Sequence, residues 1–346
     1  MKKFGSTRPV LNDITNKITY SGTQNLIIKL DEEKNPIIKS QSASNLDFNR
    51  NEIKVPETKN SFHHNSPKLG NFDQNSHLYV TEYTVEIIIY QLSYLLELEK
   101  KINISDRFLN RFSNQVVETR SRLVNTIVRA QNKFSLCQEV PFLTVQIFDR
   151  YLDLTPIEEI DLILLTATAF FIASKYEDKS KAYLSLIDRM IGNSYTRLDI
   201  RKMEVVILEK LDLSIPLPLE FLRRFSMING FNSKNHIVAM YFLELSLLDF
   251  EFSVMKPSYL AACAFCLSIK LFNKVEWSQK LEIESTYKLI DLSSGMQKLA
   301  QLVLKVNQLD FEYKETWKKF NEPSMFQVSS MPELNGVKIR EIALGI

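Results

Sequence analysis

The chain has 346 residues, of which 45% are hydrophobic and 24% are charged, and its formal net charge is +2. This length allows two or three domains, and the near-neutral charge gives no support for nucleic-acid binding. Three cysteines are too few for a disulfide scaffold, and no apolar segment follows the first lysines, which argues against a secretory signal. No uncharged run is longer than that between Asp161 and Lys175, which is too short to span a membrane. We therefore expect a reducing compartment, nucleus and cytoplasm.

Residues 1–78 are rich in Asn, Ser and Lys and lack sustained apolar periodicity, so we predict a disordered leader. Within it, Arg8, Leu11, Ile14 and Asn16 recur at regular intervals. One interpretation is an ordinary disordered tail. The other is a short linear motif that a partner binds in an extended conformation. The choice depends on what the rest of the chain is.

From residue 79 onward the apolar residues recur with helical periodicity. The stretch 79–104 predicts one amphipathic helix with Tyr83 on its apolar stripe. Five more helices are expected over 119–134, 139–154, 155–178, 185–192 and 194–213. The third of these should begin at a capping box formed by Thr155 and Glu158, and the fifth should start at a Thr196 cap. Because its body is apolar on every side, other helices should surround it.

Two prolines in "SIPLPLEF" then interrupt the series, and five further helices are expected over 218–229, 235–250, 256–272, 281–292 and 295–309. The run Ala167-Thr-Ala-Phe…Lys175 recurs as Ala262-Cys-Ala-Phe…Lys270 at one constant offset. We predict an all-α fold of two tandem five-helix bundles without a sheet. The expected domains are a leader (1–78), an N-terminal helix (79–104), two bundles (105–215 and 216–322) and a loose C-terminal tail (323–346).

The segments "TRSRLVNTIV", "IFDRYL", "ASKYED" and "RKMEVVILEKL" resemble the four signature segments of a cyclin box. The polar framework of that family maps onto Arg120, Leu123, Asp149, Lys175 and Glu204. The chain is thus similar to A/B-type mitotic cyclins over about residues 79–320, and its second bundle looks more B-like. The resemblance implies the cyclin fold and a non-catalytic activator of a cyclin-dependent protein kinase, without cofactor or metal.

Arg120 and Asp149 each lie within an apolar stripe, and a buried charge needs a partner, so we expect the two to form a structural ion pair. Lys175 ends one helix and Glu204 lies early in another, where the helix dipole favours each charge. The resemblance implies that this second pair faces the C-helix of the kinase. It also implies kinase contacts for a further set: Tyr83, Ile172, Tyr176, Glu177, Asp178, Leu208 and Leu213.

The family's substrate-docking groove combines an apolar run, a tryptophan and an acidic residue. The corresponding residues here are polar or basic: Thr119, Arg122, Leu123, Thr126 and Arg129. Basic Arg-x-Leu peptides of kinase substrates should therefore bind poorly, because both apolar area and charge complementarity are lost. We expect that the groove either takes no ordinary docking peptide or recognises acidic peptides.

Ahead of a cyclin-like body, Arg8, Leu11, Ile14 and Asn16 match the destruction-box pattern of mitotic cyclins. The resemblance implies recognition by the anaphase-promoting ubiquitin ligase and ubiquitin-dependent degradation.

Two alternatives remain at the level of sequence. A transcription factor of the TFIIB type also has tandem cyclin-like units, but it would require a basic DNA-facing surface and usually a zinc ribbon. A helical scaffold that binds no kinase is preferable if Lys175 or Glu204 is buried and paired within the chain. Cys263 and Cys266 are spaced like a metal or redox pair, but they lie in an apolar helix and are expected to be buried thiols.

Overall fold

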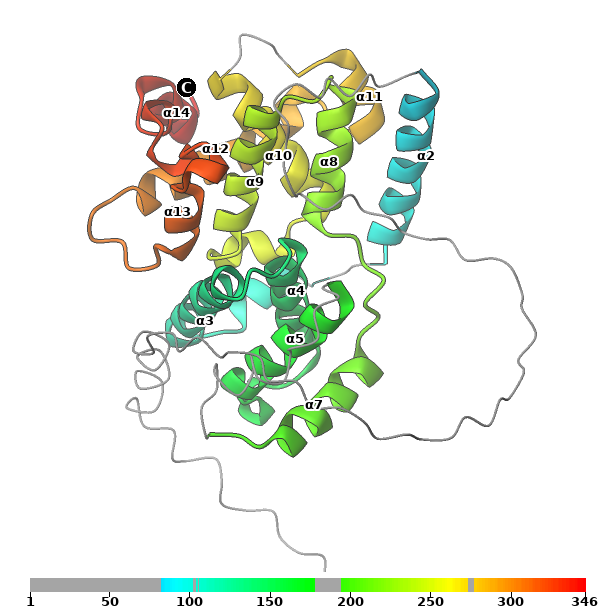
Figure 1. Ribbon diagram of the computed structural model, residues 1–346, viewed down its shortest axis with the longest axis vertical. Coiled ribbons are helices and arrows are strands. Elements are labelled where there is room, and N and C mark those ends of the chain that lie inside the picture. The colour runs from blue at the N-terminus through cyan, green and yellow to red at the C-terminus, as the bar shows by residue number, and fades with distance from the viewer. Residues whose placement is uncertain (1–81, 102–103, 105, 178–193, 273–276) are drawn as a thin grey trace, which may run out of the picture. The chain divides into compact units, whose positions relative to one another are not determined.

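Figure 1 shows the computed structural model, which describes residues 82–101, 104, 106–177, 194–272 and 277–346. The described residues form α-helices and 3-10 helices and contain no strand, so the predicted all-α class is confirmed. The leader and the expected helix over 185–192 lie outside the described residues. None of the described helices combines the length and the apolar character needed to cross a bilayer.

The described helices of the first bundle are α3 (Asn114–Lys133), α4 (Glu139–Leu154), α5 (Leu162–Glu177) and α7 (Arg197–Lys210). Helix α5 packs against the other three, most extensively against α4 and α7. Its residues 165–174 are buried around the whole circumference, as the apolar sequence predicts. Because α5 occupies the centre, its exposed C-terminal residues are held on a rigid element.

The predicted start of this central helix was wrong. Thr155 follows the end of α4, and a short 3-10 helix (η2, Ile157–Glu159) intervenes before α5. The true cap is Asp161, whose Oδ1 accepts hydrogen bonds from the amides of Ile163 (3.0 Å) and Leu164 (3.1 Å). Asp161 directly precedes the apolar residues of α5, so its carboxylate caps the helix at that point. The polar residues before Asp161 therefore stay outside the helix.

The second bundle contains α8 (Pro218–Ile228), α9 (Ser233–Ser246), α10 (Pro257–Phe272), α11 (Gln279–Ser285) and α12 (Leu289–Val306). Helix α10 packs against α8, α9 and α12, so it is the counterpart of α5. The helix expected over 281–292 is divided, because Thr286 adopts a left-handed conformation (φ 68°) that ends α11. The Asp291 carboxylate then accepts the Lys288 amide (3.0 Å) and starts α12 earlier than predicted.

Helix α2 (Glu82–Glu99) packs against α8 and α10 of the second bundle, as Figure 1 shows. Leu92 and Leu95 are buried, whereas the Tyr90 and Tyr94 side chains are 78% and 60% exposed. The sequence pattern places Tyr90 and Tyr94 on the apolar stripe together with Leu92 and Leu95, so the buried stripe is narrower than predicted. The side chain of Tyr83 lies outside the described residues.

A buried carboxylate joins the end of α2 to the start of α10. Glu99 is 5% exposed and accepts hydrogen bonds from the amide (2.6 Å) and the hydroxyl (2.5 Å) of Ser258. Because Ser258 lies in the first turn of α10, Glu99 also faces the positive end of that helix dipole. Burial nevertheless raises the pKa of Glu99, and the hydrogen bonds from Ser258 oppose that rise.

The C-terminal residues are folded, so the predicted loose tail was wrong. They form α13 (Glu315–Phe320), the 3-10 helices η4 (Pro323–Met325), η5 (Val328–Ser330) and η6 (Pro332–Leu334), and α14 (Val337–Leu344). Helix α14 packs along α12, and the Gln301 amide donates to the Ala343 carbonyl (2.8 Å). Leu334 and Ile339 are fully buried. Each of these elements is too short for its periodicity to be recognised in the sequence.

Candidate functional site

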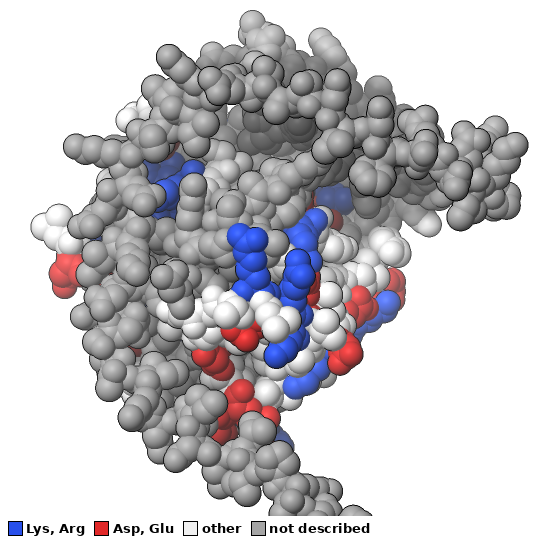
Figure 2. All heavy atoms as spheres, turned by 60° about the horizontal axis from the view of Figure 1, so that its bottom comes forward, with Lys and Arg blue, Asp and Glu red and all other residues white. Residues whose placement is uncertain are grey.

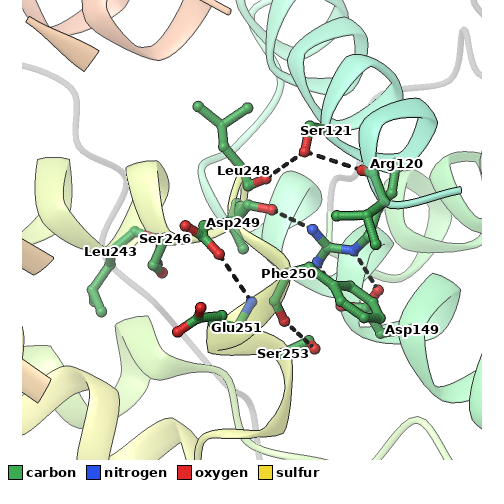
Figure 3. Close-up of polar contacts among 12 residues, drawn as sticks. Arg120, Ser121, Asp149, Leu243, Ser246, Leu248, Asp249, Phe250, Glu251 and Ser253 are labelled. Atoms are coloured by element: carbon green, nitrogen blue, oxygen red, sulfur yellow. Dashed lines mark hydrogen bonds and ion pairs between the residues drawn. The ribbon is translucent and has the colours of Figure 1, made fainter. Parts of the chain in front are cut away.

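The expected structural ion pair is present between α3 and α4 (Figure 3). Arg120 Nε donates to Asp149 Oδ1 and Nη2 donates to Oδ2, both at 2.7 Å. The two side chains are 2% and 3% exposed. A bidentate pair of this kind fixes the register of the two helices, because each charge would be costly to bury alone.

Arg120 also reaches the second bundle, which the sequence did not indicate. Its Nη1 donates to the backbone carbonyl of Leu247 at 2.9 Å, just after α9. The guanidinium carbon lies 5.5 Å from the centre of the Phe250 ring. Beside it, Ser121 Oγ donates to the Leu248 carbonyl at 2.8 Å (Figure 3). The ion pair is thus also the point at which α3 holds the second bundle.

Lys175 and Glu204 come together at the surface between α5 and α7. Lys175 Nζ donates to Glu204 Oε1, and the ammonium lies 4.3 Å from the centre of the Phe171 ring. The Lys175 side chain is 40% exposed and that of Glu204 is 14% exposed. The pair is therefore formed within the chain, yet its cation remains accessible to solvent.

Apolar side chains are exposed next to this pair. Tyr176 is 60% exposed and Leu208 is 46% exposed, although large apolar side chains are usually buried in a folded protein. Leu213 is half-buried, and Ile172 is 3% exposed, so Ile172 supports the surface from beneath and offers a partner little area. Figure 2 brings the α7 end of the molecule forward and shows basic, acidic and uncharged side chains beside one another there.

The position of α7 is set by its first turn. Thr196 Oγ1 accepts the Asp199 amide (3.2 Å), and the Asp199 carboxylate accepts the Thr196 amide (2.8 Å). This capping box starts α7 where the sequence predicted. Glu204 lies in the middle of the 14-residue helix α7 and not early in it as predicted, so its partner is Lys175 at the end of α5 and not the helix dipole.

Glu177 lies in an acidic environment that the sequence did not reveal. Burial raises its pKa to about 7, and the charges of Glu139 and Glu220 add to the rise, whereas Arg223 opposes it. Arg223 itself forms an ion pair with Glu139 across the two bundles. These groups come from α4, α5 and α8, so no local sequence pattern could have joined them. Asp178 lies outside the described residues.

The residues expected at the substrate-docking groove are all half-buried on α3. The hydroxyls of Thr119 and Thr126 donate to carbonyls of their own helix, at 2.8 and 3.0 Å. Arg129 Nη2 forms an ion pair with Glu315 Oε1 (3.3 Å) in the C-terminal residues. The basic character predicted for this face is therefore partly neutralised from within the chain.

Within the described part of the chain, no group of three or more His, Cys, Asp or Glu residues could hold a metal ion. Cys263 and Cys266 are both buried in α10 as free thiols. Burial raises the pKa of each thiol to about 12. Neither is therefore a thiolate at neutral pH, which disfavours a redox or metal role.

Two family models match the chain. The N-terminal cyclin domain matches residues 90–216 and the C-terminal cyclin domain matches residues 216–334. Among solved structures, a viral cyclin from herpesvirus saimiri matches with a TM-score of 0.54 at 19% identity, over 63% of this chain and 96% of the viral chain. At that identity the likeness shows the fold.

Curated relatives match over most of the described residues. G2/mitotic-specific cyclin-B1 of Anguilla japonica is 33% identical over 274 residues, which are 78% of this chain and 66% of the relative. Cyclin-B1 of Xenopus laevis is 32% identical over 78% of this chain and 68% of the relative. For cyclin-B2 of Bos taurus the identity is 34% over 74% of this chain and 64% of the relative. The chain thus spans about two thirds of their length. With two matched domains and B-type mitotic relatives, the chain belongs to the cyclin family.

Proposed function

We propose that this chain is a non-catalytic subunit that binds and activates a cyclin-dependent protein kinase and thereby regulates mitotic cell-cycle progression at G2/M. Membership of the cyclin family and the similarity to G2/mitotic-specific B-type cyclins support this proposal. The kinase, not this chain, supplies the catalytic groups.

The observation that carries the proposal is the surface formed by the end of α5 and by α7. Tyr176 and Leu208 expose apolar area beside the Lys175–Glu204 pair. Exposed apolar groups flanked by a cation and an anion are suited to a partner helix that presents apolar side chains and free backbone groups. Lys175 and Glu204 are paired within the chain, but at 40% and 14% exposed neither side chain is fully buried, so the condition that would favour a scaffold without a kinase is not met.

The mechanism follows from what a kinase needs. Its strand lysine must pair with a glutamate of its C-helix before the ATP phosphates are aligned. A partner that binds the inward position of that helix more tightly than the outward position shifts the population toward the active state. In our proposal Tyr176 and Leu208 supply the apolar contact, and Lys175 and Glu204 fix its register by hydrogen bonding.

The experiment compares Lys175→Ala with the matched control Lys270→Ala. Lys270 is the repeat counterpart of Lys175 at the end of α10, and it is also exposed. Each purified chain is titrated against a mitotic cyclin-dependent kinase, with kinase binding and histone phosphorylation as readouts. Removing Lys175 should weaken binding by about 2 kcal/mol or more, whereas removing Lys270 should leave it unchanged. Equal effects of the two substitutions would contradict the proposed surface.

We also propose that the chain is destroyed through its leader, in the nucleus and cytoplasm, by the anaphase-promoting ubiquitin ligase. The four-position match of Arg8, Leu11, Ile14 and Asn16 supports this, and these residues lie outside the described part of the structure. Replacing Arg8 and Leu11 by Ala should prolong the half-life of the chain in mitotic extract. An unchanged half-life would remove the support that this motif gives.

A further inference from the structure

The C-terminal residues 311–320, which include α13, lie across helix α3. We call them the 311–320 segment. Helix α13 packs against α3 of the first bundle and α9 of the second, as Figure 1 shows at the α3–α13 contact. Phe320 is fully buried and Tyr313 is 7% exposed, so the segment is part of the packed structure.

The polar contacts of the segment fall on one stripe of α3. The Tyr313 hydroxyl donates to the Glu118 carboxylate, and Arg122 lies close enough to this hydroxyl to lower its pKa. Glu315 uses its amide to donate to Asn125 Oδ1 (3.1 Å), while its carboxylate accepts from Arg129 Nη2 (3.3 Å). The contacted α3 residues recur at spacings of four, three and four, so they lie on one helix face.

This stripe contains both arginines of the face where the resemblance implied substrate docking. Burial raises the pKa of Tyr313 to about 12, with the charge of Glu118 adding to the rise, so the hydroxyl keeps its proton and remains a donor. Among the described residues, Arg122 Nε and Arg129 Nη1 are buried without a hydrogen-bond acceptor. The two guanidinium groups thus have unused donors on their buried sides, and the segment leaves only part of each side chain exposed, 22% for Arg129.

A second anchor holds the segment in place. Lys319 Nζ donates to Gln131 Oε1 of α3 (3.0 Å) and forms a buried ion pair with Glu244 of α9. A ligand that is part of the same chain competes with a free peptide at an effective concentration in the millimolar range. A docking peptide of ordinary micromolar affinity would therefore not displace it.

We propose that the 311–320 segment is a built-in ligand of the Arg122–Arg129 face, which closes this face of α3 to docking peptides. When the segment is released, the face would accept peptides that present a carboxylate beside a tyrosine hydroxyl, as the segment itself does. The proposal concerns the choice of external peptides and does not depend on kinase binding at Lys175 and Glu204.

The test uses a fluorescein-labelled peptide of the sequence FEYKETWKKF and the full chain, with fluorescence anisotropy as readout. The wild-type chain should show no saturable binding. In Tyr313→Phe/Glu315→Gln the segment loses its contacts to both arginines, and the peptide should bind at least about tenfold more tightly than to wild type. Adding Arg122→Gln and Arg129→Gln to that variant should abolish the gain. Tight binding to the wild-type chain, or no gain in the double variant, would overturn the proposal.

Hydrogen exchange on the unmodified chain provides a test that needs no variant. The Glu315 amide, which donates to Asn125, should exchange as slowly as the amides of α13. Exchange at the rate of an open chain would show that the segment leaves the face freely and would overturn the proposal. Circular dichroism and thermal unfolding establish that each variant is folded before its peptide affinity is compared.

Discussion

Arg120 of the first bundle donates a 2.9 Å hydrogen bond to the backbone carbonyl of Leu247 in the second, while two other nitrogens of the same guanidinium hold Asp149. The Arg120 side chain thus joins α3 to α4 within the first bundle and also joins the first bundle to the second. Since the site at α5 and α7 belongs to the bundle that Arg120 organises, this residue affects function only through the fold.

Replacing Arg120 by Ala should destabilise the chain by about 3–5 kcal/mol, because Asp149 is left buried without its cation. The double replacement Arg120→Met/Asp149→Leu should cost less than the single one, since no charge remains buried. Chemical denaturation of the three chains measures this difference. A double variant as unstable as Arg120→Ala would show that the Leu247 contact, not the charge on Asp149, dominates.

Tyr176→Ala and Leu208→Ala should leave stability within about 0.5 kcal/mol of wild type, because both side chains are exposed in the free chain. Kinase affinity should nevertheless fall by about 2 kcal/mol for each, as expected of central apolar contacts. Ile283→Ala and Ile290→Ala are matched controls, since these isoleucines are 67% and 75% exposed on the second bundle. A similar loss of affinity in the controls would contradict a specific surface.

The free energy of unfolding should depend on Glu177 between about pH 4.5 and pH 7. Because burial raises the pKa of Glu177 in the folded chain, the folded state binds more protons than the unfolded state within this window. The contribution of Glu177 therefore becomes less favourable as the pH rises toward 7 and stays so above it. Glu177→Gln should lose less stability over that range than wild type. Urea titrations on both sides of the window measure the difference, and parallel pH profiles would contradict it.

Removing residues 323–346 should lower the midpoint of thermal unfolding. The truncation deletes Leu334 and Ile339, which are fully buried, and each such side chain contributes about 1.5–3 kcal/mol. It also uncovers the face of α12 that α14 packs against. An unchanged midpoint would show that the C-terminal residues are dispensable for the fold.

The sequence predicted those parts of the fold whose patterns are long. The periodicity over residues 139–154 and the Thr196 cap gave helix α4 and the start of α7 at their observed positions. The proposed capping box at Thr155 failed because Asp161 lies closer to the apolar body and caps it there. Thr286 ends α11 through a left-handed backbone conformation. This end was not predictable, because β-branched residues such as threonine rarely adopt that conformation.

The candidate site was predictable from the sequence where a residue could be assigned by its own motif. It was not predictable where side chains from several helices form one environment. Lys175 and Glu204 follow from the resemblance. The environment of Glu177 depends on Glu139 and Glu220 from two other helices, so only the packed structure reveals it. The 311–320 segment was missed for the same reason, since its contacts on α3 lie almost two hundred positions away along the chain.

The bond between Glu99 and Ser258 has a consequence for synthesis on the ribosome. Helix α2 is translated before either bundle. The Glu99 carboxylate at its end can bind the Ser258 amide only after a further 159 residues have been translated. Leu92 and Leu95 are buried on the helix that packs against α8 and α10, and both of these helices emerge later. During that interval α2 exposes apolar surface that the finished fold buries, and exposed surface of this kind makes folding intermediates prone to aggregation.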